Sequence, residues 1–211
     1  MKTRSLWIRL LLCVLPLFIG LALWNRLPAS IPTHWNAEGV IDGYSSRTFA
    51  VLFFPLFFTG MELLVSFALK SDPKNHNQDR FMYELGLWVL PVMSVVVMVI
   101  TYASAFGMHV PVNVILMTLV GVLFIFLGNQ MPKTRQNYTI GIKVPWTLNS
   151  ERNWNLTHRM AGPLWVIGGL VMILTGFLGN STVLVWVMLA VIFVLAFVPM
   201  IYSYLLYKKG I

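Results

Sequence analysis

The chain has 211 residues, of which 58% are hydrophobic and 10% are charged. A soluble domain carries about a quarter of charged residues, so a chain of this composition needs lipid to solvate much of its surface. The formal net charge of +8 could indicate nucleic acid, but basic residues of membrane proteins usually follow topology, and we expect no direct nucleic-acid binding. A single cysteine, Cys13, excludes an intrachain disulfide.

Six apolar segments are candidates for membrane-spanning helices, which need about 20 mostly apolar residues. They are Trp7–Leu27, Thr48–Leu69, Glu84–Phe106, Val112–Gly128, Pro163–Leu178 and Thr182–Tyr207. We expect the first to be a retained helix, because its apolar run is longer than that of a signal peptide. The sequence therefore predicts an all-α, polytopic integral membrane protein with six transmembrane helices, divided into residues 1–69, 70–130 and 131–211.

The distribution of Lys and Arg predicts the orientation of these helices. Thirteen of the fifteen lie in the amino terminus, the second and fourth connections and the carboxyl terminus, whereas Arg26 and Arg47 alone lie on the opposite side. Basic residues accumulate in cytoplasmic loops. We therefore expect both termini and the long fourth connection, residues 131–162, to be cytoplasmic, and the connection at residues 28–47 to be outside.

The outer connection, residues 28–47, is predicted to be a compact polar loop with turns at Glu38–Gly39 and Asp42–Gly43. On a helix, the four-residue spacing of His34, Glu38 and Asp42 would favour a metal site. The prolines and glycines around them argue against a helix, so we expect no metal and no cofactor. The candidate binding residues here are His34, Trp35 and Asp42.

Glu62 is an acidic residue inside the second predicted span. A charged carboxylate in hydrocarbon costs several kcal/mol, so such a residue is a functional candidate with a partner. We expect it to be protonated or to pair inside the bundle. Its candidate partners near the cytoplasmic half are Asn129, Gln130, Lys133 and Arg159.

The long inner connection is the largest polar interval of the chain, and it has internal structure. Residues 139–146 alternate like an extended segment that ends at a proline. Asn149 or Ser150 is a predicted helix cap, with Glu151 in the first turn. Beyond it, Trp154, His158, Ala161 and Trp165 share one helical face. This indicates an amphipathic helix on the inner leaflet that runs toward the fifth span and bends at Gly162–Pro163. The candidate binding residues here are Asn137, Lys143, Trp146, Trp154, His158 and Arg159.

Two stretches together resemble a known family of bacterial membrane proteins. The outer loop, IPTHWNAEGVIDGYSSR, is similar to the DUF1648 segment through Ile31, Pro32, His34, Trp35, Asn36, Gly39, Asp42, Gly43 and Tyr44. The inner connection resembles the SdpI family signature, which is matched by Gly128, Asn129, Pro132, Lys133, Arg135, Asn137, Ile140, Gly141, Ile142, Pro145, Trp146, Thr147, Leu148, Trp154, Thr157, His158, Arg159 and Gly162. Lys143 and Val144 depart from the usual arginine and threonine, and a lysine loses bidentate geometry.

The resemblance implies a non-enzymatic immunity protein that protects a bacterium from its own secreted toxic peptide. It also implies a receptor that senses the toxin and holds an ArsR-type repressor at the membrane. Besides the lipid bilayer, the implied partners are thus a toxic peptide outside and a repressor inside. Two alternatives stay open: a transporter or channel, coupled to protons through Glu62, and a membrane enzyme that uses His34 or His158.

Overall fold

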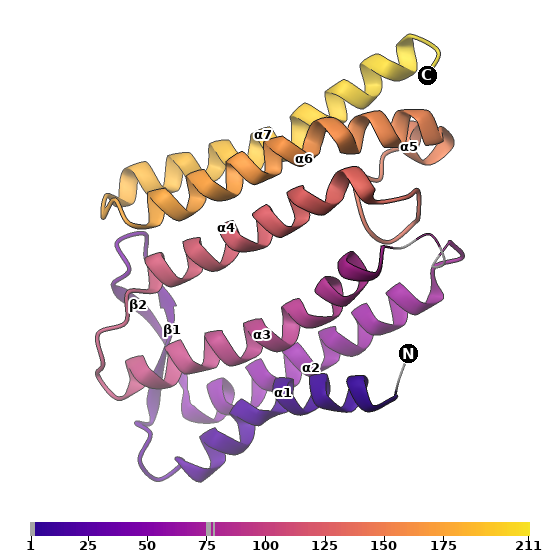
Figure 1. Cartoon of the computed structure of the whole chain (residues 1–211). Coiled ribbons are helices and arrows are strands. Elements are labelled where there is room, and N and C mark those ends of the chain that lie inside the picture. Colours follow the sequence, from indigo (N-terminus) through magenta and orange to yellow (C-terminus); the bar gives the residue numbers. More distant parts are fainter. Residues whose placement is uncertain (1–2, 75–76, 78) are drawn as a thin grey trace. The chain divides into compact units, whose positions relative to one another are not determined.

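The structure is a computed structural model that describes residues 3–74, 77 and 79–211. Figure 1 shows helices throughout, with one short β-hairpin. In chain order the elements are α1 (Thr3–Ala22), β1 (Ser30–Trp35), β2 (Ile41–Ser46), α2 (Arg47–Ser71), α3 (Arg80–Ala105), α4 (Val112–Gln130), η2 (Met131–Lys133), α5 (Pro145–Asn149), α6 (Glu151–Gly176) and α7 (Ser181–Lys208).

Within the described residues, α1, α2, α3, α4, α6 and α7 are the helices long and apolar enough to cross a membrane, as the sequence predicts. Their outward faces carry large apolar side chains; Phe67, Leu174 and Trp186 are 71%, 67% and 68% exposed. Such surfaces are stable in lipid rather than in water. The chain forms two compact units, one made of residues up to Ala68 with Glu84–Val112, the other of Leu69–Tyr83 with Asn113–Ile211.

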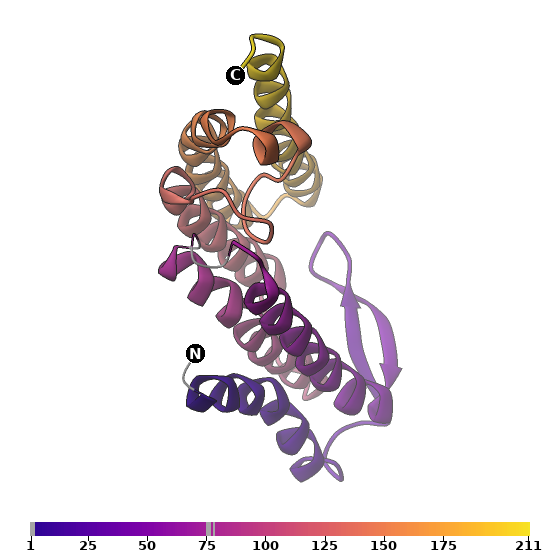
Figure 2. The same ribbon diagram turned by 90° about the vertical axis from the view of Figure 1, so that its right-hand side faces the viewer.

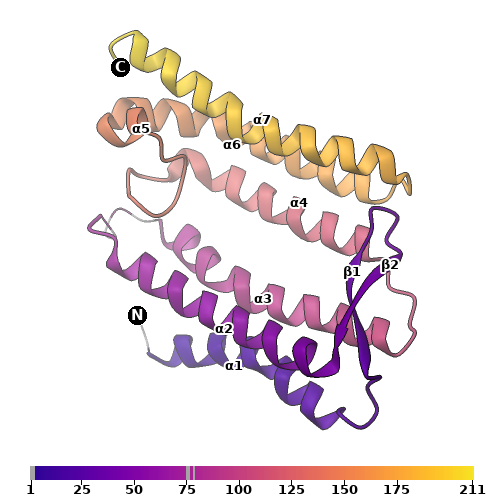
Figure 3. The same ribbon diagram turned by 180° about the vertical axis from the view of Figure 1, so that it is seen from behind.

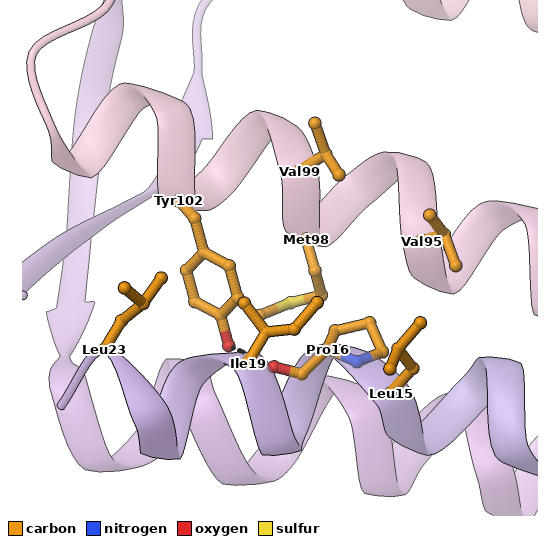
Figure 4. Close-up of a pocket in the computed structure, with 8 residues that line it drawn as sticks. All are labelled: Leu15, Pro16, Ile19, Leu23, Val95, Met98, Val99 and Tyr102. Carbon is orange, nitrogen blue, oxygen red and sulfur yellow. Dashed lines mark hydrogen bonds between the residues drawn. The ribbon is translucent and has the colours of Figure 1, made fainter.

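The core of the first unit lies where α1, β1, α2 and α3 meet. Its buried residues are Leu27, Ile31, Ala50, Val51, Met98 and Tyr102. Pro16 interrupts the hydrogen bonding of α1, and its carbonyl accepts a 2.8 Å hydrogen bond from the Tyr102 hydroxyl. Beside this bond, Leu15, Ile19 and Val95 line an open apolar groove between α1 and α3 (Figure 4). The bond thus fastens α1 to α3 beside the proline.

The outer connection is a β-hairpin, which corrects the prediction of an all-loop segment. The strands β1 and β2 pair antiparallel, and Figures 2 and 3 show them beside the start of α2. The turn at Glu38–Gly39 is present, with Gly39 at φ 76°. The turn predicted at Asp42–Gly43 is wrong, because Gly43 lies inside β2 opposite His34, where a Cβ would come within 2.7 Å of the His34 Cβ.

In the second unit, α6 and α7 run side by side (Figure 1). The fifth predicted span and the helix predicted before it form the single helix α6, so the chain does not leave the helix at Gly162–Pro163. Ser150 caps it, as predicted, and accepts a hydrogen bond from the Asn153 backbone. A Cβ on Gly162 would lie 2.9 Å from the Gly128 carbonyl oxygen of α4, so this glycine lets the two helices approach closely.

Candidate functional site

The inner connection between η2 and α5 is fastened to α6 by two aromatic side chains, Trp154 and His158. We call this arrangement the loop clasp. The Trp154 indole, which is fully buried, donates a 2.7 Å hydrogen bond from Nε1 to the Thr134 carbonyl. The His158 ring stacks on it with centroids 4.0 Å apart. The face predicted to lie on the leaflet is therefore covered by the chain's own loop, which corrects that prediction.

Both ring nitrogens of His158 are committed. Nε2 accepts a 3.0 Å hydrogen bond from the Ile142 amide, so it carries no proton. The proton is therefore on Nδ1, which donates to the Trp154 carbonyl at 2.9 Å. A histidine held by both nitrogens has no free lone pair to act as a base, and its role here is to position the loop.

Gly141 makes this contact possible. It adopts φ +117°, which side-chain-bearing residues rarely adopt. A Cβ there would lie 2.6 Å from His158 Nε2 and 2.9 Å from the Trp154 ring. The glycine therefore allows the loop backbone to lie directly on the stacked rings.

Asn137 shapes the loop from inside. It is fully buried, and its Oδ1 accepts the amides of Thr139 and Ile140 at 3.0 and 2.7 Å. Its Nδ2 donates to the Arg135 carbonyl at 2.9 Å. These bonds turn the chain sharply, so the predicted extended segment is wrong: its amides bond to side chains instead of a strand, and Pro145 begins α5.

Sequence reasoning missed three further residues of the clasp. Asp72, at the end of α2, accepts the Tyr138 amide at 3.0 Å and the Thr139 hydroxyl at 2.6 Å. Gln136 donates to the Thr147 carbonyl at 2.8 Å. The Thr147 hydroxyl donates to the Ile142 carbonyl at 2.7 Å. All three side chains are buried. Thr147 is one of the residues that resemble the family signature, whereas the only sequence signal of Asp72 and Gln136 is a polar residue type in an apolar chain.

The clasp leaves its cations outside. The exposed ones are Lys133, Arg135, Lys143, Arg152 and Arg159. Lys143 donates to the Thr139 carbonyl at 2.8 Å. Trp146, the remaining candidate on this side, lies on α5 and contacts Tyr204 and Tyr207 of α7, with ring centroids 5.0 and 6.3 Å away. The candidate residues therefore separate into a buried scaffold and an exposed basic surface.

On the hairpin, His34 and Asp42 form an exposed pair. Asp42 Oδ1 lies 2.6 Å from His34 Nδ1, and the two side chains are 42% and 71% exposed. Trp35 is half-buried. Within the ranges that the structure describes, no three His, Cys, Asp or Glu side chains gather as a metal site would require. The pair is therefore an accessible polar site on the hairpin formed by β1 and β2.

The partner of Glu62 is Arg9, not one of the four residues that the sequence suggested. Arg9 Nε donates to Glu62 Oε1 at 2.7 Å, and both side chains are fully buried. Ser66 donates to the same Oε1 at 3.0 Å and accepts from Arg9 at 3.1 Å. Among the residues that the structure describes, Glu62 Oε2 has no hydrogen-bond partner. The ion pair joins α1 to α2 inside the bundle.

Comparison with known proteins matches both segments. Residues 133–203 match the SdpI/YfhL protein family, and residues 11–59 match a domain of unknown function, DUF1648. The chain is also 25% identical over 204 residues to "Immunity protein SdpI" of Bacillus subtilis (strain 168), covering 96% of this chain and 95% of that protein.

The chain is therefore similar to the SdpI/YfhL family over residues 133–203. With this similarity and the six apolar helices of its described residues, the chain is a multi-pass bacterial membrane protein, as the sequence predicts. The DUF1648 match spans most of α1, the hairpin and half of α2, and the SdpI match begins at the end of η2 and includes the loop clasp. No solved structure matches the chain.

Proposed function

We propose that this protein is a membrane immunity protein that protects a bacterium from a secreted toxic peptide. The observation that carries the proposal is the similarity to Immunity protein SdpI over 96% of the chain. It includes both the segment that forms the hairpin and the segment that forms the loop clasp.

We propose further that the hairpin faces outward and that the loop clasp and both termini face the cytoplasm. The support is the distribution of Lys and Arg, with Arg26 and Arg47 alone on the hairpin side. The Arg47 side chain is bound within the protein, since it donates hydrogen bonds to the Trp24 and Leu27 carbonyls at 2.6 and 3.0 Å. The side with few free cations is the one that a secreted peptide reaches first.

The hairpin is the proposed contact for the toxic peptide. It exposes Tyr44, which is 60% exposed, together with the His34–Asp42 pair. An aromatic ring beside a polar pair suits an amphipathic peptide that arrives along the membrane surface. Ile31, by contrast, is fully buried and anchors the hairpin to the helices, so the hairpin presents these groups from a fixed base.

On the inner side we propose a second, signalling role, in which the protein senses the toxin and retains an ArsR-type repressor at the membrane. The exposed cations Lys133 and Arg135 follow α4 directly, on a loop that the clasp holds rigid. Such a surface suits an acidic patch of a cytoplasmic partner. No catalytic role is proposed, because His158 is committed to the loop and His34 lies on the opposite side in this topology.

A survival assay tests the proposal. The full chain is produced in a strain killed by the toxic peptide that Immunity protein SdpI counters, with membrane insertion checked by immunoblot. Protection is expected for the wild type, and it should fall when His34 and Asp42 are both replaced by alanine. Glu38→Ala, at the exposed turn, is the matched control and should protect fully. An inserted wild-type chain that gives no survival refutes the immunity role.

The signalling role has a separate readout, the fraction of a fluorescently tagged repressor at the membrane after toxin is added. Lys133→Gln with Arg135→Gln should release the repressor while survival is kept. If the repressor never reaches the membrane in wild-type cells that do survive, the signalling role is wrong and the immunity role stands.

A further inference from the structure

One face of α6 is apolar and uncovered along most of the helix. Ile167, Leu170, Leu174 and Phe177 are 58%, 49%, 67% and 66% exposed, and their spacing of three and four residues places them on one stripe. In a membrane protein such a stripe contacts lipid tails. We call it the α6 lipid stripe.

Two arginines continue this stripe toward the start of the helix. Pro163 lies four residues before Ile167, Arg159 four residues before Pro163, and Arg152 seven residues before Arg159, so all three keep the helical register. All three are exposed. Along this one face, from the end of α6 toward its start, the exposed side chains thus change from apolar groups to guanidinium groups.

The other faces of these first turns are occupied by protein. Asn153 bonds to α7, donating to the Ser203 carbonyl at 2.9 Å and accepting from the Ser203 hydroxyl at 2.6 Å. Trp154 and His158 face the loop clasp. The two arginines therefore lie on a side of the helix that is exposed in the described part of the second unit.

The depth of the arginines follows from the length of the helix. With 26 residues, α6 is ~39 Å long, whereas the hydrocarbon core is ~30 Å thick. The apolar stripe occupies the end from Pro163 onward, so Arg159, ~6 Å before Pro163 along the axis, lies at the headgroup layer. Arg152 lies ~10 Å further out.

Neither guanidinium is compensated inside the protein. In the part of the chain that the structure describes, Arg152 and Arg159 make no hydrogen bond or ion pair with another side chain. The nearest acid along the helix, Glu151, is adjacent in sequence and points to another face. Guanidinium groups bind phosphate through two parallel N–H donors, and phosphates are the anions present at this depth.

We propose that Arg152 and Arg159 bind the headgroup phosphates of anionic phospholipids, whose tails lie along the α6 lipid stripe. Arg159 is the nearer of the two to the hydrocarbon and holds the phosphate, and Arg152 extends the positive surface outward. The site would fix how deep α6 lies in the membrane. It would also fix the position of the loop clasp, because the clasp is attached to the same first turns of α6. This inference does not depend on the immunity role or on which side of the membrane the clasp faces.

The experiment is native mass spectrometry of the full chain released from micelles that contain equal amounts of phosphatidylglycerol and phosphatidylcholine with the same tails. The wild type should retain phosphatidylglycerol in preference. Arg159→Gln and Arg152→Gln should each lower that preference about fivefold, the equivalent of ~1 kcal/mol per basic residue at an anionic surface. Arg159→Lys keeps the positive charge but loses the two parallel N–H donors, so this variant should retain part of the preference for phosphatidylglycerol.

Arg135→Gln is the matched control, because Arg135 is equally exposed but lies in the loop, off the stripe. The preference of the Arg135→Gln variant for phosphatidylglycerol should equal that of the wild type. Equal retention of the two lipids, or an equal loss in Arg135→Gln and Arg159→Gln, overturns the proposal. So does displacement of the lipid by soluble glycerol phosphate or by an acidic peptide, since either would mean that the arginines bind anions from water. Circular dichroism checks folding, and Arg152→Gln, in the first turn of α6, tests the site if Arg159→Gln unfolds.

Discussion

The buried pair between Arg9 and Glu62 allows a quantitative prediction about the stability of the first unit. Both side chains are fully buried and 2.7 Å apart, so each has lost its water and depends on the other. Removing one partner of a buried pair costs about 3–5 kcal/mol, whereas replacing both by apolar residues of similar volume is often neutral. We therefore expect Glu62→Met and Arg9→Met to destabilise strongly, and the double variant to recover most of the loss.

The two single variants should not be equal. In Glu62→Met the guanidinium stays charged, with only the Ser5 and Ser66 hydroxyls, at 2.8 and 3.1 Å, as acceptors. In Arg9→Met the carboxylate can take up a proton and become neutral, which a guanidinium cannot do. We expect losses of about 5 kcal/mol for Glu62→Met and about 3 kcal/mol for Arg9→Met, the two ends of the range for a broken buried pair.

The assay is the free energy of unfolding in mixed micelles, with sodium dodecyl sulfate as the denaturant and helical circular dichroism as the signal. The exposed Arg135→Met serves as a control and should stay within about 0.5 kcal/mol of the wild type. Additive losses in the double variant would show that the two side chains do not interact energetically. A larger loss for Arg9→Met than for Glu62→Met would refute the argument from proton uptake.

Three further predictions concern the loop clasp and the topology. Gly141→Ala should cost about 2 kcal/mol and speed tryptic cleavage of the loop, whereas Gly179→Ala, also at positive φ but in open space, should cost about 1 kcal/mol and leave cleavage unchanged. Asp72→Asn should cost about 1–3 kcal/mol, because the two Asp72 oxygens accept the Lys74 and Tyr138 amides and asparagine turns one of these acceptors into a donor. Hydrogen exchange of the loop amides would report the loss. Cysteines at Lys143 and Glu38 should react with a membrane-impermeant maleimide from opposite sides of the cell, and labelling of both from one side would contradict the proposed topology.

The sequence predicts the six spans well because hydrophobic length alone decides whether a helix can cross a bilayer. The cap at Ser150 and the turn at Gly39 were also predictable, since both depend on a few neighbouring residues. The packing of the first turns of α6 was not predictable: the polar turns before Pro163 look like a helix on the membrane surface that runs toward the fifth span. They remain one helix because Asn153, Trp154 and His158 find partners in α7 and the loop, which are distant in sequence.

The errors share one physical cause, that long-range pairing leaves no local pattern. Arg9 lies 53 residues before Glu62, and in the sequence it looks like one more cation at the start of the first span. The hairpin was missed for a similar reason: β1 and β2 contain prolines and glycines that favour loops. Pairing of the strands and burial of Ile31 outweigh those local preferences, as tertiary contacts usually do for β-structure.

The two matched segments divide their residues differently between structure and surface, and this bears on where specificity can reside. In the clasp, Asn137, Trp154 and His158 are buried and use their polar atoms on the loop itself, so changing them would alter any inner function through loss of the loop's shape. The exposed cations around them are accessible to a partner. In the hairpin, the exposed side chains of His34 and Asp42 contact each other. A ligand could replace this contact with contacts of its own at little cost to the fold. A variant that changes ligand choice while the fold is kept is therefore expected in the hairpin or among the cations, and not among the buried clasp residues.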